Sequence, residues 1–590
     1  MSKHTQPLKA YVATYRWRAL AGFLFVVGTI TFGLAVPFVL REIVDGLESG
    51  AMTRRTLIHW VLLFFGGSGL ATLCSVMMRK VILSLAQCVE YDIRKAVFNH
   101  LTTLDHAYYQ RERTGDLMTK MSSDLGSIRE LVGQGLLQGS RIVLGFPLAF
   151  AIMFAIHARL SLAILAIMPV ISVAFFFIIR LIRARYDASQ EQFSTISNFC
   201  QEAFSGFRTV KGFGIEDRMR GRFKEQNDEY IARNMALTRV EEPVWPFMVF
   251  MFGVGTLILL LVGGRYVIRG ELTIGEFVQF NQYMLYLHWP MLALGWTSNL
   301  IQRGLASWKR VRSILDAEPD IRVEDTEAHR ADRVRGAIRF EQVGLTLGGQ
   351  ALLKDINLHL PEGETLAITG PTGSGKTLLV SLIVRLLDPT SGRITLGGQD
   401  LRDIPVRVLR NSFGIAPQEP FLFSDTLANN IALGLSPMEG TEGLPHEEKV
   451  LWASGVAHLH DDVMGFPEQF KTMLGERGVT LSGGQRQRTA ISRAIALDPE
   501  ILILDDVFSA VDTQTEAAIL AQLLPVLGQK TSILISHRVS TLKHADRILV
   551  LEDGRIVQDG THDDLAAVPG YYRELDEMQR LEARLEEEAS

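Results

Sequence analysis

The chain has 590 residues, of which 47% are hydrophobic and 21% charged, with a formal net charge of −5. The mean hydropathy is +0.16. This composition excludes a disordered or collagen-like chain and favours membrane segments. Residues 1–330 carry 36 Lys and Arg against 28 Asp and Glu, a balance of +8, and the remainder carries 24 against 37, a balance of −13. The sequence therefore predicts two halves of different chemistry.

Three cysteines, Cys74, Cys88 and Cys200, show no metal-ligand spacing and cannot build a disulfide framework. We interpret them as buried small apolar residues.

The first half contains six stretches without Asp, Glu, Lys or Arg, which are 19–40, 56–78, 142–158, 160–179, 243–264 and 277–302. A bilayer core needs about 20 helical residues. Five of the six stretches reach that length. The stretch 142–158 falls short, and we expect a neighbouring residue such as Arg159 to extend it at the membrane interface. Six such runs favour membrane helices over the buried helices of a soluble enzyme. The first run is too long, and lacks the Ala-x-Ala pattern, for a removable signal peptide.

Basic residues predict the orientation of these helices. The expected outer loops 45–55, 159 and 265–276 hold five arginines, whereas the inner segments 85–135 and 184–242 hold six and nine basic residues. The positive-inside rule therefore places both termini in the cytoplasm.

The two inner segments are rich in helix formers, with apolar residues at three- and four-residue spacing. We interpret them as helices that continue the membrane spans. Glycines at 115, 212 and 214 predict bends there. Such bends give short cross-helices that would press against another domain, or else ordinary solvated turns.

The second half contains a phosphate-binding loop. Residues 364–369 read as a short buried strand, and an apolar helical run follows from Leu378. Between them lies a G-x-x-x-x-G-K-[ST] match, which consists of Gly370, Pro371, Thr372, Gly373, Ser374, Gly375, Lys376 and Thr377. The glycines let backbone N–H groups converge on phosphate oxygens beside a helix N-terminus. Lys376 reaches the β- and γ-phosphates, and the Thr377 hydroxyl binds Mg²⁺.

Two further motifs complete a nucleotide site. Residues 501–505 form an apolar strand that ends in Asp505, a carboxylate that can hold Mg²⁺ through water. A second anion-binding helix start follows Leu481 and consists of Ser482, Gly483, Gly484 and Gln485. One domain seldom needs two phosphate-binding surfaces for one nucleotide. The second surface therefore serves a nucleotide bound by another copy or by a partner.

With these motifs the chain resembles an ATP-binding cassette exporter half-transporter over nearly its whole length. The resemblance implies a membrane α-helical domain of six transmembrane helices plus an α/β P-loop nucleotide-binding domain, with ATP and Mg²⁺ as cofactors. The expected boundaries are 1–320 for the transmembrane domain, 321–336 for a linker, 337–575 for the nucleotide-binding domain and 576–590 for an acidic C-terminal helix.

The resemblance also implies individual roles. Gln418 would contact Mg²⁺ and the attacking water, and His537 would sense the γ-phosphate. Asp512 would belong to the site through the turn 509–512. Residues 481–485 correspond to the signature motif of the family, and a further family motif at 475–478 precedes it. The cross-helices near 113–124 and 210–217 would be the coupling helices of the family.

Two positions depart from the family pattern. Asp505 corresponds to the Walker B Asp of the family. In the family a Glu follows this Asp directly, whereas this chain has Asp506 there. Asp is one methylene shorter and withdraws the carboxylate by about 1.5 Å, and misplacement of about 1 Å can cost about a hundredfold in rate. The position where an aromatic residue stacks on adenine is held by Leu347, which loses the π-face. Alternatively the backbone shifts and Asp506 still works.

Because the signature 481–485 is intact, we expect a heterodimer whose other half-transporter is a different chain that carries the catalytic Glu. A homodimeric exporter, an importer and a nucleotide-gated regulator share the architecture and stay open. A soluble P-loop ATPase acting on nucleic acid would lack the six spans, so we expect no nucleic-acid partner.

We expect a multi-pass protein of the cell (inner) membrane that transports an amphipathic small molecule such as a drug or lipid. The absence of acidic residues from the six spans argues against a small-ion path. Candidate substrate contacts are aromatic residues of the last two spans, namely Trp245, Phe247, Phe250, Tyr283, Tyr286 and Trp289.

Overall fold

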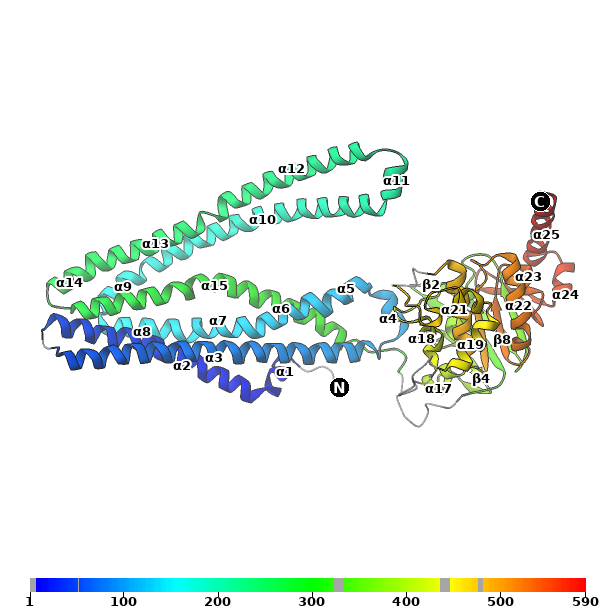
Figure 1. Ribbon diagram of the computed structural model, residues 1–590, viewed down its shortest axis with the longest axis horizontal. Coiled ribbons are helices and arrows are strands. Elements are labelled where there is room, and N and C mark those ends of the chain that lie inside the picture. The colour runs from blue at the N-terminus through cyan, green and yellow to red at the C-terminus, as the bar shows by residue number, and fades with distance from the viewer. Residues whose placement is uncertain (1–6, 51, 323–332, 436–445, 476–480, 590) are drawn as a thin grey trace. The chain divides into compact units, whose positions relative to one another are not determined.

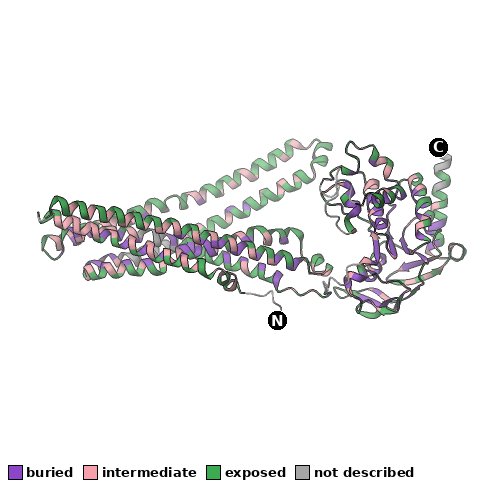
Figure 2. Ribbon diagram, turned by 60° about the horizontal axis from the view of Figure 1, so that its bottom comes forward, coloured by how far each residue is buried: buried purple, intermediate pink, exposed green. Residues whose placement is uncertain are grey.

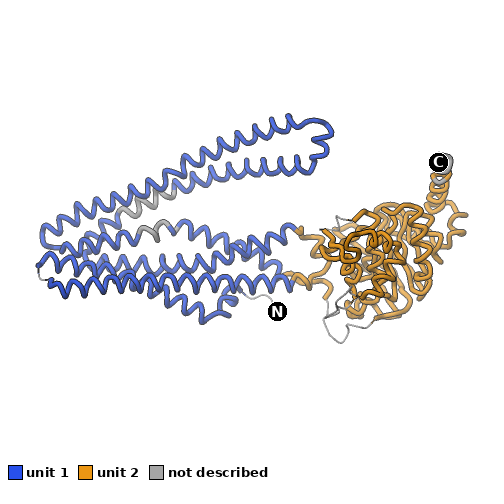
Figure 3. Tube along the Cα trace, viewed as in Figure 1, with its two compact units in different colours: residues 1–100, 115–316 blue, residues 101–114, 317–590 orange. Residues whose placement is uncertain are grey.

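The computed structural model describes residues 7–50, 52–322, 333–435, 446–475 and 481–589. It divides into two compact units (Figure 3), of which unit 1 comprises Met1–His100 and Gly115–Asp316, and unit 2 comprises Leu101–Thr114 and Ala317–Ser590. The side chains of 167–176, 288–292, 294, 583 and 586–589 lie outside the description, and so does the expected substrate contact Trp289.

Unit 1 is built from long helices (Figure 1). Its helices, with π-helical turns marked η, are α1 (Leu8–Thr14), α2 (Arg16–Glu48), α3 (Arg54–Leu101), α5 (Thr114–Thr119), η1 (Lys120–Asp124), α6 (Leu125–Glu130), η2 (Leu131–Gly135), α7 (Leu136–Ser140), η3 (Arg141–Gly145), α8 (Phe146–Ile156), α9 (Ala158–Leu165), α10 (Ile167–Ser205), α11 (Phe207–Gly212), α12 (Glu216–Glu241), α13 (Val244–Ile258), η4 (Leu259–Gly263), α14 (Gly264–Ile268) and α15 (Ile274–Leu315).

Four helices of unit 1 are long and apolar enough to cross a membrane, by length and composition, within the described part of the chain. They cover 16–48, 54–101, 114–156 and 216–268. Three predicted spans lie wholly within them, and the span 142–158 lies within them up to residue 156. The two other predicted spans, 160–179 and 277–302, fall in α9–α10 and in α15. The count of six membrane helices stays a prediction.

The core of unit 1 forms where α2, α8 and α15 pack together. Val26, Ile30 and Leu34 of α2 and Met153 of α8 belong to one buried apolar cluster, with α15 packed against both helices. Tyr283 of α15 is 1% exposed, and its hydroxyl donates to the Leu34 carbonyl oxygen at 2.7 Å. Tyr283 therefore packs and ties α15 to α2, and our interpretation of it as a substrate contact is wrong.

One buried ion pair joins α15 to the helix that begins at Thr114. Asp124, in η1, accepts hydrogen bonds from Ser307 at 2.9 Å and from the Arg310 Nε at 2.9 Å. The Asp124 side chain is 3% exposed and that of Arg310 is 54% exposed. The carboxylate is thus satisfied within the helix bundle while the cation reaches the surface.

The structure places the short cross-helices slightly earlier than predicted. The first is α4 (His106–Arg111), because Asp105 accepts from the Tyr108 N–H at 3.0 Å and starts a helix there. It belongs to unit 2, where Ala107 packs against the core of the strands. The expected position 113–124 is therefore wrong, since Gly115 lies inside α5. The second, α11, spans 207–212 between Gly206 and Gly214.

The cysteines also differ from expectation. Cys74, Cys88 and Cys200 are free thiols of intermediate exposure. Arg18 donates to the Cys88 Sγ at 3.0 Å. They are therefore not the fully buried core residues that the sequence led us to expect. Figure 2 shows that the long helices of unit 1 carry buried, intermediate and exposed residues along their length.

Unit 2 contains two sheets. The four-stranded antiparallel sheet has the order β2-β1-β4-β5, and the six-stranded sheet has the order β10-β9-β3-β8-β7-β6, in which only the β10 pairing is antiparallel. The strands are β1 (Ile338–Leu347), β2 (Gln350–Leu360), β3 (Thr365–Thr369), β4 (Ser391–Leu396), β5 (Gln399–Asp400), β6 (Phe413–Ala416), β7 (Ile501–Asp505), β8 (Thr531–Ile535), β9 (Arg547–Glu552) and β10 (Arg555–Gly560).

The helices of this unit pack on the six-stranded sheet or on one another. They are α16 (Lys376–Ile383), α17 (Val406–Asn411), α18 (Leu427–Ile431), α19 (Glu447–Val456), α20 (His460–Met464), α21 (Gly483–Ala496), α22 (Thr513–Leu527), α23 (Val539–Leu542), α24 (His562–Ala567) and α25 (Tyr571–Ala589), with short 3₁₀ turns at 432–434 and 469–471.

The apolar runs of the central strands explain this arrangement. Every residue of β3, β7 and β8 is buried. Alternate residues enter different clusters, for example Leu502 and Leu504 one core and Ile501 and Ile503 the other. A parallel sheet buried on both faces requires such uninterrupted apolar strands. Their carboxyl ends bring residues 370, 505 and 537 to one edge.

Candidate nucleotide-binding site

The phosphate loop connects β3 to α16. Gly370 has φ +144°, and a Cβ there would collide with the carbonyl oxygen of Leu551 in β9. Gly375 has φ +105° and is the N-cap of α16. Both conformations need glycine, because a side chain would clash. The loop therefore turns tightly and presents the N-terminus of α16, where a phosphate is favoured.

Two polar groups of this loop, Lys376 and Ser374, are suited to a phosphate. The Lys376 Nζ donates to the carbonyl oxygens of Gly370 at 2.8 Å and Pro371 at 2.9 Å, and burial lowers its pKa. Ser374 is 4% exposed, and among the described residues its hydroxyl has no hydrogen-bond partner. A buried unpaired hydroxyl costs about 1–3 kcal/mol. A bound phosphate would satisfy both groups.

Thr377 and Asp505 form the candidate metal position. The Thr377 hydroxyl donates to Asp505 Oδ2 at 3.1 Å. Burial raises the pKa of Asp505, opposed by the Thr377 hydrogen bond, and the neighbouring Asp506 raises it further. A hydroxyl and a carboxylate at this spacing suit Mg²⁺, which prefers few protein oxygens beside water and phosphate. When bound, Mg²⁺ would neutralise charge on the phosphates.

Asp506 lies beside Gln418. The Gln418 Nε2 donates to Asp506 Oδ2 at 3.1 Å. Burial raises the pKa of Asp506, while His537 and this hydrogen bond lower it. Asp506 has φ +47°, a left-handed conformation that Asp and Asn tolerate better than most residues. Burial also lowers the pKa of His537, which favours a neutral imidazole.

These residues line one cavity of about 250 Å³ in unit 2. It brings together most of the predicted Walker residues, namely Thr372, Gly373, Gly375, Lys376, Thr377, Gln418, Asp505, Asp506 and His537, with Leu378 and Ile535. A phosphate chain and a metal ion fit its donor set, which consists of an ammonium, backbone N–H groups, hydroxyls and carboxylates.

The signature residues do not line that cavity. Ser482 is the N-cap of α21 and forms a capping box with Gln485, whose Nε2 donates to Asp462 Oδ2 at 3.1 Å. The capping box satisfies the backbone N–H groups of Ser482 and Gln485 at the start of α21. The second phosphate-binding surface stays a prediction.

A buried glutamine missed in the sequence links the signature helix to Asp506. Gln487 is 4% exposed, donates to the Ser509 hydroxyl at 2.7 Å and accepts from the Ala510 N–H at 3.0 Å. Ser509 in turn donates to the Asp506 carbonyl oxygen at 3.0 Å. Its position three residues after Gly484 was the only available signal in the sequence.

Two further predicted site residues of unit 2, Leu347 and Asp512, lie at the end of a strand and at the start of a helix. Leu347 ends β1 and is 37% exposed. Asp512 is the N-cap of α22 and accepts from the Thr515 N–H at 2.9 Å, which lowers the pKa of its carboxyl. Residues 476–480, which include most of the motif before the signature, lie outside the described residues.

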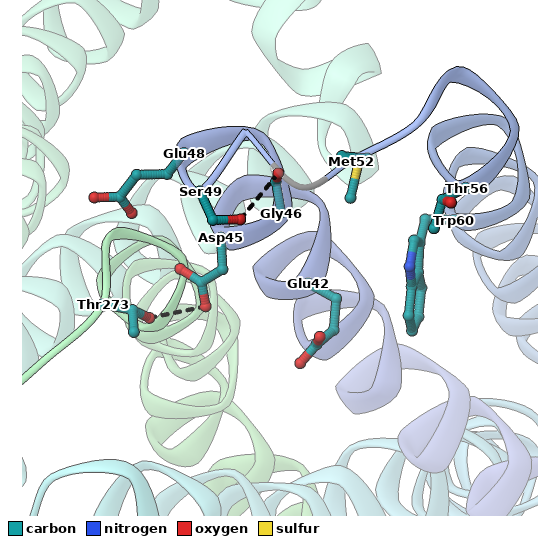
Figure 4. Close-up of a pocket in the computed structure, with 9 residues that line it drawn as sticks. All are labelled: Glu42, Asp45, Gly46, Glu48, Ser49, Met52, Thr56, Trp60 and Thr273. Carbon is teal, nitrogen blue, oxygen red and sulfur yellow. Dashed lines mark hydrogen bonds between the residues drawn. The ribbon is translucent and has the colours of Figure 1, made fainter.

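Two of the cavities in the described part of unit 1 differ in character. One of about 720 Å³ lies where α2 ends and α15 begins, lined by Glu42, Asp45, Glu48 and Trp60 among others (Figure 4). Its Asp45 accepts from Thr273 at 2.9 Å and from the Gly275 N–H at 2.7 Å, and thereby anchors α15. The other, of about 500 Å³, is apolar except for Thr31.

The remaining aromatic candidates differ in exposure. Trp245 and Phe250, in the first half of α13, are each 64% exposed. Phe247 and Tyr286 are partly buried, and Tyr286 lies against Gly145. Trp245 and Phe250 are therefore the candidates whose rings are free to meet a ligand or lipid.

The fold and the site define a membrane protein that carries a P-loop nucleotide-binding domain in the same chain. Two family models match it, the ABC transporter transmembrane region over residues 19–291 and ABC transporter over residues 353–509. The chain belongs to the ABC transporter family, binds ATP, and couples ATP hydrolysis to transport across a membrane.

Several relatives match over nearly the whole chain. An uncharacterized ABC transporter ATP-binding protein, YknU of Bacillus subtilis, is 33% identical over 98% of both chains. The multidrug resistance-like ATP-binding protein MdlA of Escherichia coli is 32% identical over 97% of this chain and 96% of its own. A solved bacterial Atm1-family ABC exporter with ATP bound has a TM-score of 0.75 and 26% identity, covering 96% of this chain and 99% of that chain.

Proposed function

We propose that this chain is one subunit of a heterodimeric exporter of amphipathic or hydrophobic compounds, and that its own Walker site hydrolyses ATP slowly. The single observation that carries the proposal is Asp506, one methylene shorter than the glutamate of the family pattern and already hydrogen-bonded to Gln418. A carboxylate held against Gln418 is less able to reach a water on the γ-phosphate.

The site residues take the following roles in this proposal. The phosphate loop and Lys376 bind the triphosphate, Thr377 and Asp505 hold Mg²⁺ with Gln418, and His537 contacts the γ-phosphate. Leu347 contacts the adenine base. Ser482–Gln485 and Asp512 act on the nucleotide of the partner subunit. The proposed domain boundaries are 1–320 for the transmembrane domain, 321–336 for the linker, 337–575 for the nucleotide-binding domain and 576–590 for the acidic C-terminal helix.

Exposed aromatic residues support the pairing with a second half-transporter. Phe204, Phe207 and Phe213 surround α11 and are 75%, 51% and 77% exposed. On unit 2, Phe421 and Phe423 form an edge-to-face pair at 5.1 Å and are about half exposed. Apolar side chains of this size in clusters mark protein contacts.

Export of an amphipathic compound rests on the relatives and on the membrane unit. MdlA is named as multidrug resistance-like, and YheI of Bacillus subtilis, 34% identical over 92% of both chains, as a probable multidrug resistance transporter. The apolar cavity beside Val27 and Pro147 suits such a ligand. We place the protein in the cell (inner) membrane with both termini in the cytoplasm.

The test is to purify the full chain alone and measure ATP hydrolysis and transport in liposomes. We expect slow hydrolysis, and a large increase when a companion half-transporter co-purified from native membrane is added. Robust turnover by the chain alone, abolished by Asp506→Asn, would show that it works as a homodimer.

A further inference from the structure

The C-terminal helix α25 carries a side chain that grips the segment bearing His537. The amide of Gln579 donates from Nε2 to the His537 carbonyl oxygen at 2.6 Å. Its Oε1 accepts from the Val539 N–H at 2.8 Å. We propose that Gln579 is a positioning residue for His537, so that the last helix of the chain sets how the imidazole meets the nucleotide.

The geometry restricts the backbone at His537 strongly. One planar amide engages the carbonyl before Arg538 and the N–H after it, and it therefore fixes the peptide planes on both sides of that residue. A single hydrogen bond would leave rotation free, whereas two bonds from one rigid group do not. His537 lines the nucleotide cavity, so a turn of its backbone displaces the ring.

The residue between the two bonds is held from the opposite side. Arg538 forms an ion pair with Glu516 of α22, and its guanidinium donates to the Val511 carbonyl oxygen at 3.1 Å. Glu516 is 2% exposed and also accepts from Thr541 at 2.7 Å. The segment 537–539 is thus clamped between α22 and α25, and Gln579 supplies the α25 half of the clamp.

Helix α25 is anchored firmly enough to act as this support. Tyr572 and Leu575 of its first turns are 0% and 8% exposed. The Tyr572 hydroxyl lies 2.7 Å from His562 Nδ1. The backbone N–H of Tyr572 donates to Gln558 Oε1 at 3.2 Å. Gln579 follows seven residues after Tyr572, which is about two helical turns. Its amide therefore extends from a fixed helix.

The inference rests on the proposed role of His537 at the γ-phosphate, and the experiment separates the two. The full-length protein in lipid nanodiscs is given radiolabelled Mg-ATP at substoichiometric amounts, and the single-turnover rate constant and the ATP affinity are measured. The variants are Gln579→Ala, His537→Ala and the double variant. Met578→Ala is the control, because Met578 is 50% exposed and adjacent.

We expect Gln579→Ala to lower the rate constant about tenfold, with ATP affinity within about twofold of wild type. In the His537→Ala background, Gln579→Ala should change the rate by less than about twofold, because residues that act through one another are not additive. If Gln579→Ala does not fold, Gln579→Glu replaces it as the test variant. Glutamate has the same length and keeps the acceptor for the Val539 N–H, but it places a carboxylate oxygen against the His537 carbonyl oxygen. We therefore expect the same loss of rate.

Two patterns overturn the inference. Rates for Gln579→Ala equal to those for Met578→Ala contradict it, and so does a full additional loss in the His537→Ala background, which indicates general destabilisation. If His537→Ala itself hydrolyses ATP at the wild-type rate, the proposed role of His537 fails first and the inference falls with it.

Discussion

Gln418 and Asp506 are joined by a hydrogen bond of 3.1 Å between the Gln418 Nε2 and the Asp506 Oδ2. Gln418 follows β6 and Asp506 follows the adjacent strand β7. The shortened carboxylate is therefore not isolated, since an amide already holds one of its two oxygens. This contact makes Asp506 the position at which the proposed slow site is best tested.

Asp506→Glu should raise the single-turnover rate of ATP hydrolysis about tenfold or more, because the added methylene extends the carboxylate by about 1.5 Å. Asp506→Asn, which keeps the left-handed backbone, should lower it. The measurement is phosphate release by the purified full chain under excess protein. An Asp506→Glu rate equal to wild type would contradict the idea that carboxylate reach limits this site.

Asp506→Asn should also stabilise unit 2 in the absence of nucleotide and Mg²⁺. Burial raises the pKa of Asp506 in the folded state, so the folded state binds more protons than the unfolded one and loses stability as pH rises through that raised pKa. At pH about 7.5 the variant should therefore melt higher than wild type, and the difference should shrink as pH falls towards about 4. Differential scanning calorimetry at both pH values checks this. If Asp506→Asn and the wild type melt at the same temperature at each of the two pH values, the Asp506 carboxylate is solvated in the folded protein.

Ser374→Ala should act with opposite sign on the empty and the nucleotide-bound protein. The buried hydroxyl of Ser374 has no partner within the part of the chain that the structure describes, which costs the empty protein stability, so its removal is neutral or stabilising. With ATP bound the same change removes a hydrogen bond to a charged group and should weaken affinity about tenfold. Thermal melts with and without Mg-ATP measure both effects.

Asp124→Ala should destabilise unit 1 by about 1.5–3 kcal/mol, because it leaves the buried Ser307 and the exposed Arg310 without their shared charged acceptor. Arg312→Ala is the control, since Arg312 and Asp316 form an exposed pair one turn further on. The midpoint of thermal unfolding in detergent reports the effect. Equal midpoints for the two variants would contradict the importance of the buried pair.

Trp245→Ala and Phe250→Ala should alter the stimulation of ATP hydrolysis by amphipathic compounds, whereas Tyr283→Phe should leave the compound profile unchanged. The first two rings are 64% exposed, and Tyr283 is buried with its hydroxyl on Leu34. Loss of that hydrogen bond should cost only about 0.6 kcal/mol between membrane helices. A changed profile in Tyr283→Phe alone would reverse this assignment.

The sequence by itself determined the two-part division, the apolar spans and the Walker motifs. These features depend on local chemistry: uncharged runs of bilayer length, apolar strands and glycines before Lys376 are visible at short range. The position of the first cross-helix was predicted wrongly because Asp105 starts a helix earlier than the glycine pattern indicated.

Only the tertiary structure decided which distant residues meet. Gln418 contacts Asp506 across 88 positions, and Tyr283 contacts Leu34 across 249. Gln579 reaches His537 across 42 positions, and an isolated glutamine on an acidic helix carries no sequence signal. Such contacts depend on strand order and helix packing, because folding brings together residues whose separation along the chain encodes nothing about their distance in space.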